Sequence, residues 1–154
     1  MDDMTVEERR GDLLISTDRA RIDVDAVLAM LRASHWGGGM TRPSLARAIA
    51  NSLCVGVYDA GGKQLAFARA VTDLATYAYL TDVIVAEDAR ARGLGKWMTQ
   101  LLVAHPDLQG LRRIALWTRN ARGLYERFGF STDTPPASTY MEIRPGPGGQ
   151  PRTP

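Results

Sequence analysis

The sequence predicts a mixed α+β fold, in which a β-meander is followed by a β-α-β unit. Strand-like runs flank the paired glycines Gly61 and Gly62, as expected of a hairpin. A further strand-like run, "TYAYLTDVIV", follows after a short turn, which favours an antiparallel meander. Downstream, an amphipathic helical segment lies between this run and the strand-like "RRIALWT". The order of elements therefore indicates one sheet that carries helices as well as hairpins.

Length and composition favour one globular domain. The chain has 154 residues, of which 45% are hydrophobic, and this is enough for a single core. Residues 1–11 are polar and are expected to be flexible. Residues 145–154 are rich in proline and glycine and are expected to be disordered. We therefore place the folded domain at residues 12–144.

The first part of the domain is expected to hold a short strand and two helices. "DLLIS" predicts the strand, and Asp23 or Asp25 is placed to cap a helix with its apolar residues on one face. The second helix is expected to begin at Pro43, because proline suits the first helical turn. Between the two helices lies "ASHWGGGMT", an aromatic pair followed by three glycines.

The later part of the domain supplies the remaining elements. The hairpin covers "LCVGVYDAGGKQLAFARAVT", and "TYAYLTDVIV" continues as a third consecutive strand. A helix from about Gly93 to Ala104 is expected to end at Pro106, before the strand "RRIALWT". "ARGLYERFG" predicts a short helix stopped by Gly129, and "STYMEIR" predicts a last strand.

Charge and cysteine content argue against several classes of protein. The formal net charge is +2, so no whole-molecule field favours nucleic acid or an anionic membrane as a partner. The single cysteine, Cys54, lies in an apolar run, and no cysteine/histidine cluster has the spacing of a zinc site. No apolar signal region and no segment of membrane-spanning length is present. We expect a soluble cytoplasmic protein with no metal and with Cys54 buried in a strand.

The segment "ARARGLGKWM" is the strongest candidate for a binding loop. It fits Arg-x-x-Gly-x-Gly, with Arg90, Gly93 and Gly95 in the fixed positions, and it joins a strand to an amphipathic helix. The amide N–H groups of the first helical turn would point at an anion over the loop, and Arg92 and Lys96 add positive charge. A Walker loop and a dinucleotide fingerprint need other spacings. A phosphate cradle and a solvated basic turn both remain open on this segment alone.

The loop and the segment after it together resemble a known family. "LTDVIVAEDARARGLGKWMTQLL" followed by "RRIALWTRNARGLYERFGF" resembles the two central motifs of the GNAT superfamily of acyl-CoA-dependent N-acetyltransferases. The resemblance covers about Leu13 to Ile143 and is closest to a group of short bacterial members. The chain departs from that group at Asn120 and Arg122, where those members usually carry aspartate and histidine. A different acceptor substrate would account for this departure.

The resemblance implies a twisted, mostly antiparallel sheet of about six to seven strands, with one splayed strand pair and about four flanking helices. Acetyl-CoA would lie as co-substrate in the gap of the splayed pair, with its pyrophosphate on the glycine loop. Its pantetheine arm would pair with the backbone of the preceding strand. The residues implied in cofactor binding are Val83, Ile84, Val85, Arg90, Ala91, Arg92, Gly93, Leu94, Gly95, Lys96, Asn120 and Tyr125.

Two catalytic residues are candidates. Tyr125 matches the family's tyrosine that protonates or hydrogen-bonds the leaving thiolate, although a core tyrosine would fit the same pattern. Asp82 is the candidate base, because strict alternation puts it on the apolar face of Leu80 and Ile84, where burial favours a useful base. A bulge would instead move Asp82 to the other face, and pairing with an arginine is the structural alternative. A water relay without a single base is also open.

The acceptor-binding residues are expected on the other strand face and in the helix connection. Tyr79 and Thr81 lie on the face that lines the acceptor site in many members of the family. His35 and Trp36 lie in the connection that covers the acceptor pocket there, although a packing tryptophan and a solvent-facing histidine are equally compatible.

The leading hypothesis is an acetyltransferase that moves the acetyl group of acetyl-CoA to an amine of a small molecule or a peptide, by direct attack in a ternary complex. The alternative is a non-catalytic acyl-CoA-binding regulatory module. We expect neither nucleic acid nor a membrane as a partner. A homodimer is plausible, because the last strand could pair across a two-fold axis.

Overall fold

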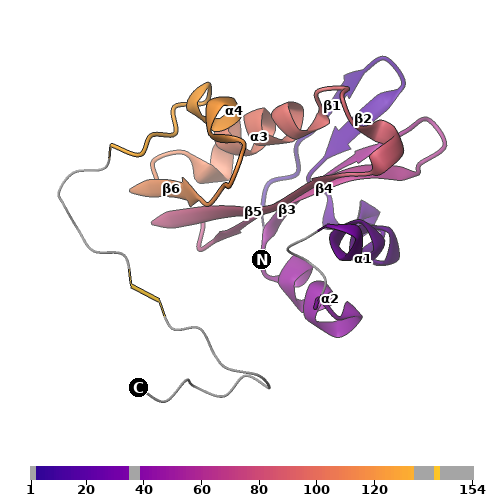
Figure 1. Ribbon diagram of the computed structural model, residues 1–154, viewed down its shortest axis with the longest axis horizontal. Coiled ribbons are helices and arrows are strands. Elements are labelled where there is room, and N and C mark those ends of the chain that lie inside the picture. The colour runs from indigo at the N-terminus through magenta and orange to yellow at the C-terminus, as the bar shows by residue number, and fades with distance from the viewer. Residues whose placement is uncertain (1–2, 35–38, 134–140, 143–154) are drawn as a thin grey trace.

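The computed structural model describes residues 3–34, 39–133 and 141–142, and these form a six-stranded sheet with helices on both faces (Figure 1). The strands lie in the sheet in the same order as in the sequence. They are β1 (Glu7–Arg10), β2 (Leu13–Ser16), β3 (Leu53–Tyr58), β4 (Gln64–Thr72), β5 (Tyr77–Val85) and β6 (Arg113–Leu116).

Strand pairing follows the predicted meander and β-α-β unit. The first five strands pair antiparallel with their neighbours, whereas β5 and β6 pair parallel. The parallel pairing requires a crossover, and α3 (Leu94–Ala104) provides it. The predicted mixed fold with a mostly antiparallel sheet is therefore confirmed.

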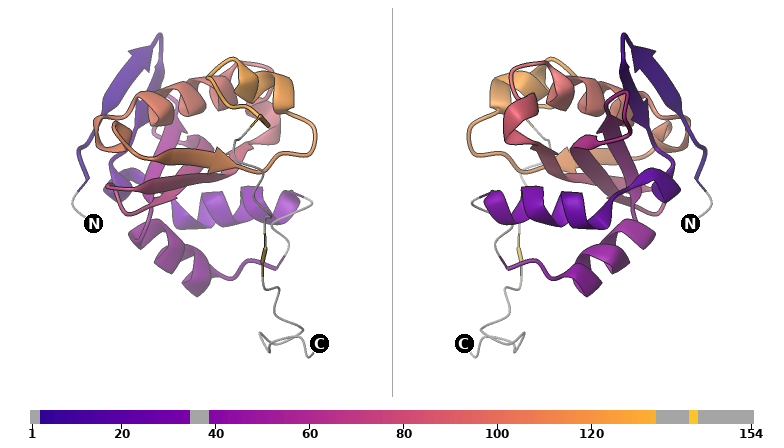
Figure 2. Two further views of the ribbon diagram at one scale, coloured as in Figure 1. Left: turned by 90° about the vertical axis from the view of Figure 1, so that its left-hand side faces the viewer. Right: turned by 90° about the vertical axis from the view of Figure 1, so that its right-hand side faces the viewer.

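Four α-helices occur in the described part of the chain, namely α1 (Val24–Ala33), α2 (Arg42–Ala50), α3 and α4 (Arg122–Glu126). Three short 3₁₀ turns, Arg19–Arg21, Glu87–Ala89 and Pro106–Leu108, lie in the connections. Helices α1 and α2 cover one face of the sheet, and α3 and α4 lie over the other (Figures 1 and 2). None of the described helices is long and apolar enough to cross a bilayer.

Local side-chain hydrogen bonds define where α1 and α2 begin. The carboxylate of Asp23 accepts from the amide of Ala26, and the hydroxyl of Thr41 accepts from the amide of Ser44. The predicted cap at Asp23 is confirmed. The second helix begins one residue before Pro43, which occupies its first turn as expected.

The sheet separates two apolar cores. On one face Val27, Leu31 and Leu45 of α1 and α2 pack with Phe67 and other strand residues. On the other face Trp97, Met98 and Leu102 of α3 pack against inward residues of β3, β4 and β5. Both faces of the central strands are therefore buried, so β3 has no exposed residue and reads in the sequence as a continuous apolar run.

The N-terminal segment differs from the expected flexible tail. Residues 7–10 form β1, which pairs with β2 from Glu7–Ser16 to Arg10–Leu13. The Trp97 indole Nε1 donates to Oε2 of Glu8 over 3.1 Å, and the Arg10 guanidinium lies 4.4 Å from the Trp97 ring centroid. Backbone pairing and this contact order a segment whose four residues are all exposed. No apolar alternation marks such an edge strand in the sequence.

Some expectations lie outside the described residues. His35 and Trp36 fall in the segment 35–38, and the predicted last strand falls in 134–144 apart from Met141 and Glu142. The proposed two-fold pairing of that strand therefore stays a prediction.

Candidate functional site

A cleft opens where β5 and β6 diverge. The two strands pair only from Tyr77–Arg113 to Leu80–Leu116, while β5 continues to Val85. The cleft has a volume of about 920 Å³ and is lined mainly by β5 from Tyr77 to Val83, by the end of β6 and the segment after it, and by Tyr125 of α4. Beyond Leu80 the edge of β5 that faced β6 has no neighbouring strand in the described part of the chain. A ligand can use that edge for backbone hydrogen bonds.

A β-bulge lies in β5 beside the cleft. Phe67 pairs with Ile84 and Arg69 pairs with Thr81, so β5 carries one residue more than β4 between these pairs. Asp82 has φ of +53°, in the left-handed region that aspartate tolerates better than most residues. The bulge reverses the alternation of side chains. Leu80 packs in the core beneath α3, whereas Ile84 packs in the core beneath α1 and α2.

Asp82 is consequently not on the face that strict alternation predicts. Its Oδ2 accepts from Nε of Arg69 over 2.6 Å. Arg69 lies opposite Cys54, which packs in the core beneath α1 and α2, so Asp82 faces the same side. The side chains of Asp82 and Arg69 are only 8% and 14% exposed. The prediction that Asp82 shares the apolar face of Leu80 is wrong, because strict alternation does not allow for the bulge. The structure instead has both features that were named as alternatives for Asp82, the bulge and the pairing with an arginine.

The glycine loop is shaped by two left-handed residues. Ala91 has φ of +60° and Gly93 has φ of +74°, and Gly93 is the N-cap of α3. Gly93 provides no side chain to cap the helix, and the first turn contains no acidic residue. The first turns of α1 and α2, by contrast, are capped by Asp23 and Thr41. The amide N–H groups at the start of α3 therefore lack the side-chain partner that the other two helices have.

Positive charge gathers around these amides. Arg90, Arg92 and Lys96 are exposed, and none of them forms an ion pair within the described ranges. The flanking Asp88 is already paired with Lys63 over 3.3 Å. The loop is also close to the cleft, since a Cβ at Gly95 would lie 3.9 Å from Cγ1 of Val83. A helix terminus with free amides and unpaired cations is suited to a phosphate group.

Tyr125 reaches the same cleft from α4. Its ring is buried and stands edge-on to Phe130, with 5.9 Å between the ring centroids. The phenol group has no hydrogen-bond partner among the residues that the structure describes. Burial raises the pKa of Tyr125, so the phenol is protonated at neutral pH and can donate a hydrogen bond into the cleft.

The turn between β6 and α4 forms the opposite wall. Asn120 lines the cleft, and the Thr118 hydroxyl accepts from the amide of Ala121 over 3.0 Å, which holds the turn in place. Arg122 is turned along its own helix, where its Nε donates to Oε1 of Glu126 over 2.5 Å. Asn120 and Arg122 are thus placed differently, because Asn120 lines the cleft whereas Arg122 is engaged on α4.

The predicted acceptor residues of β5 line the cleft as well. Tyr79 and Thr81 belong to its lining, and burial raises the pKa of Tyr79, so that its phenol is neutral. At the rim, Tyr77 and Trp117 are 42% and 65% exposed. Trp117 and Arg69 are not among the predicted site residues. The signal for Arg69 was a lone charge in the apolar run "LAFARAV", since a buried charge requires a partner.

Cys54 lies outside the lining of the cleft. Cys54 is fully buried, as predicted, and burial raises the pKa of its thiol to about 12. No cluster of three or more histidine, cysteine, aspartate or glutamate side chains suited to a metal ion occurs in residues 3–34, 39–133 and 141–142.

Comparison with known proteins finds a matching family profile and a protein of similar sequence. The profile of the acetyltransferase (GNAT) domain matches residues 50–132, which run from the end of α2 past α4. A candidate acetyltransferase of Gibberella zeae is 34% identical over 138 residues, covering 75% of this chain and 77% of that protein.

Solved structures share the fold. A candidate acetyltransferase of the GNAT family from Xanthomonas campestris pv. campestris is 40% identical and superposes with a TM-score of 0.74, over 84% of this chain and 93% of that one. Glucosamine-6-phosphate N-acetyltransferase from Arabidopsis thaliana superposes with a TM-score of 0.60 over 84% of this chain and 99% of that one. At 17% identity, the latter shows similarity of fold alone.

Proposed function

Because the chain belongs to the GNAT acetyltransferase family, we propose that it transfers the acetyl group of acetyl-CoA to an amine of a small molecule or a peptide. The observation that carries the proposal is the coincidence of two features at one place. An uncapped, cation-flanked helix terminus lies beside Val83, and Val83 lines a cleft into which a protonated tyrosine projects. The first feature suits the phosphates of the co-substrate, and the second suits the chemistry at its thioester.

The residues present fit the co-substrate. The amides of Leu94, Gly95 and Lys96 would hold the pyrophosphate, with Arg90 and Arg92 beside it, in the loop that Ala91 and Gly93 shape. The free edge of β5 from Val83 to Val85 would pair with the amide groups of the pantetheine arm. The side chain of Ile84 is buried, so its contribution would come from the backbone. Asn120 would contact the arm from the other wall of the cleft.

Bound acetyl-CoA would supply an activated acyl group, and the protein would stabilise the charge that develops during attack. Negative charge grows on the carbonyl oxygen as the amine nitrogen approaches the carbonyl carbon. The bulge leaves one residue of β5 out of register with β4, and we assign the N–H group near Val83 to this oxygen. A donor of this kind is worth about 3 kcal/mol in acyl transfer.

Proton transfer would be shared between Asp82 and Tyr125. Oδ2 of Asp82 is engaged by Arg69, but Oδ1 has no partner among the described residues and is the atom that would receive the proton of the amine, directly or through water. The new C–N bond forms as the C–S bond breaks. Tyr125 would give its proton to the departing thiolate and regain one from solvent.

Calorimetric titration of acetyl-CoA into wild type, Gly95→Asp and Gly95→Asn tests the cradle. Gly95 has no positive φ, and a Cβ there meets only Val83 at 3.9 Å, so both variants should fold. Asparagine has the shape of aspartate without its charge. We expect aspartate to weaken binding at least about tenfold more than asparagine does, since it puts a carboxylate where the phosphates sit.

A second measurement separates the enzyme from a non-catalytic binding module. Release of free thiol from acetyl-CoA is followed with a panel of amines at saturating co-substrate. Amine-dependent release supports acetyl transfer, whereas tight binding of acetyl-CoA without turnover of any amine would support the module. Failure of wild type to bind acetyl-CoA would overturn both.

A further inference from the structure

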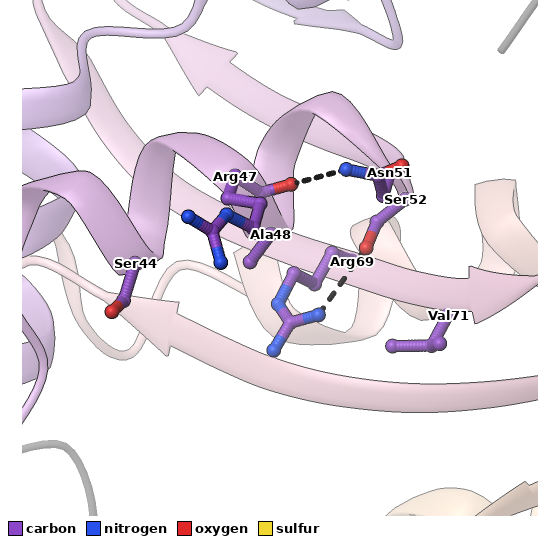
Figure 3. A pocket seen from close by; sticks show the side chains of 7 residues that line it. All are labelled: Ser44, Arg47, Ala48, Asn51, Ser52, Arg69 and Val71. Carbon is purple, nitrogen blue, oxygen red and sulfur yellow. Dashed lines mark hydrogen bonds between the residues drawn. The ribbon is translucent and has the colours of Figure 1, made fainter.

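A second groove lies on the α2 side of the sheet, next to the cleft. It has a volume of about 410 Å³ and is formed between the end of α2 and the outer half of β4. Figure 3 shows Arg47 of α2 and Arg69 of β4 extending their guanidinium groups into this space. Ser44, Asn51 and Ser52 supply further polar groups, and the lining contains no acidic residue.

Both arginines have guanidinium N–H groups without a hydrogen-bond partner among the described residues. Nε of Arg69 donates to Asp82, and its Nη1 donates to the buried Ser52 hydroxyl over 3.2 Å, which leaves Nη2 without a partner in the described chain. Arg47 is exposed, and within the same ranges its guanidinium has neither a hydrogen bond nor an ion pair. The neighbouring Arg42, in contrast, is paired with Asp25 over 2.8 Å. The groove thus presents one guanidinium held by Asp82 and one exposed guanidinium, and no acidic side chain lines the space between them.

The groove and the cleft share one face of the sheet. Arg69 is the cross-strand partner of Thr81, and Val71, which also lines the groove, is the partner of Tyr79. Thr81 and Tyr79 line the cleft. Going from β5 to α2, a ligand would meet Asp82 first, then Arg69, then Arg47. Negative charge on β5 is followed by positive charge on β4, roughly 5 Å or one strand spacing away, and then by the positive charge of Arg47 on α2.

We propose that the acceptor is an amine that also carries an anionic group, a carboxylate or a phosphate, and that Arg47 and Arg69 bind this group while the amine lies beside Asp82. The inference rests on the proposed acetyl transfer and specifies its substrate class. Arginine presents paired N–H groups that match two oxygens of a carboxylate or a phosphate. The Asp82–Arg69 pair holds one of the two forks in place, and Arg47 closes on the bound anion.

Matched acceptors test the proposal. Linear amino carboxylates, amino phosphonates and simple alkylamines, each with about two to six methylene groups to cover the strand spacings, are compared for kcat/KM and for calorimetric binding. The variants are Arg47→Gln and, as a control with the same charge change on the same helix, Arg42→Gln. For at least one anionic series we expect a preference over alkylamines of at least about tenfold, which Arg47→Gln abolishes and Arg42→Gln leaves intact.

The outcomes are distinguishable from those of the proposed function. If alkylamines and anionic amines are turned over equally, the anionic acceptor is overturned while acetyl transfer stays in place. The same holds if Arg47→Gln and Arg42→Gln lose the preference for anionic amines to the same extent. Neither binding nor turnover of any anionic amine by a protein that binds acetyl-CoA would also overturn it. The series with the higher kcat/KM relative to alkylamines shows whether the bound anion is a carboxylate or a phosphate-like group. Arg69→Lys, which keeps the charge beside Asp82 but loses the fork, should lower kcat/KM more for the anionic series than for the alkylamines.

Discussion

Nε of Arg69 and Oδ2 of Asp82 lie 2.6 Å apart across the bulge between β4 and β5. Asp82 lines the cleft and Arg69 lines the groove beside α2, so this one ion pair belongs to the walls of both cavities. Both side chains are largely withdrawn from water, and each satisfies the charge of the other. The stability of the bulge and the charge pattern of the acceptor face therefore depend on the same contact.

Substitutions at Asp82 should separate the ion pair from backbone strain. Asp82→Gly keeps the left-handed φ of +53° accessible but removes the carboxylate. We expect it to lower the free energy of unfolding by about 2–4 kcal/mol, because Arg69 loses its partner in a mostly buried site. Asp82→Ala should lose about 1 kcal/mol more than Asp82→Gly, because a left-handed φ is unfavourable for alanine. Urea denaturation measures both.

Asp82→Asn is the matched control for that pair. Its amide oxygen can still accept from Arg69, and asparagine tolerates the left-handed region, so the loss of stability should be smallest in the series. If Asp82→Asn is no more stable than Asp82→Ala, then neither the hydrogen bond from Arg69 nor the left-handed backbone conformation limits stability at this position.

Tyr125→Phe should lower kcat with little change in the binding of acetyl-CoA. The hydroxyl has no structural partner among the described residues, so its removal leaves the packing against Phe130 intact. We expect kcat to fall by about 10²-fold, within the range for general acid catalysis, in steady-state assays with any amine that is turned over. Phe130→Leu, which alters the same cluster without the phenol, is the control. Equal losses in the two variants would assign Tyr125 to packing.

The pH dependence of the same reaction gives a further check on Tyr125. Burial raises its pKa, so the phenol should remain protonated and the proton donor present up to at least about pH 10, the ordinary value for tyrosine. An alkaline decline of kcat below that pH that is absent in Tyr125→Phe would contradict a raised pKa.

Stability should decline at alkaline pH in part through Cys54. Burial raises the pKa of this thiol from 9.0 to about 12 in the folded protein. The folded state then retains the proton that the unfolded chain loses above pH 9.0, so the contribution of Cys54 is complete below that pH and is lost as the pH rises towards 12. In Cys54→Ala, the slope of unfolding free energy against pH in this window should be shallower by up to about 1.4 kcal/mol per unit. An unchanged slope in urea titrations at several pH values would argue against the buried thiol as its source.

Removal of residues 2–10 should destabilise the protein, although this segment is polar and exposed. The deletion uncovers Trp97 and removes the carbonyl of Met4, which lies 2.9 Å from Nε2 of the buried His105. We expect a loss of more than about 2 kcal/mol and a red shift of tryptophan fluorescence, from the exposure of a large apolar ring. Glu8→Gln, which retains β1, should show a much smaller effect. A truncated protein as stable as the full chain would mean that β1 adds nothing to the core.

Local patterns in the sequence were sufficient for most of the fold. Hairpin glycines, capping residues and apolar spacing predicted β3, β4, β5 and the three longer helices, because each of these signals acts within a few residues. The same is true of the glycine loop, where Gly93 and the missing acid in the first turn can be read directly from "ARARGLGKWM". What remained hidden depended on contacts between distant segments.

The tertiary structure alone decided which residues face each other around the cleft. Strict alternation put Asp82 beneath α3, but the extra residue of the bulge arises from the pairing of β5 with β4, and one such residue moves every later side chain to the other face. Likewise, β1 is ordered by β2 and by Trp97 on α3, and Arg69 meets Asp82 only after the sheet has formed. The sequence by itself determined most of the elements and the glycine loop, since their causes are local. Register, faces and charge partners follow from long-range pairing, which no window of sequence contains.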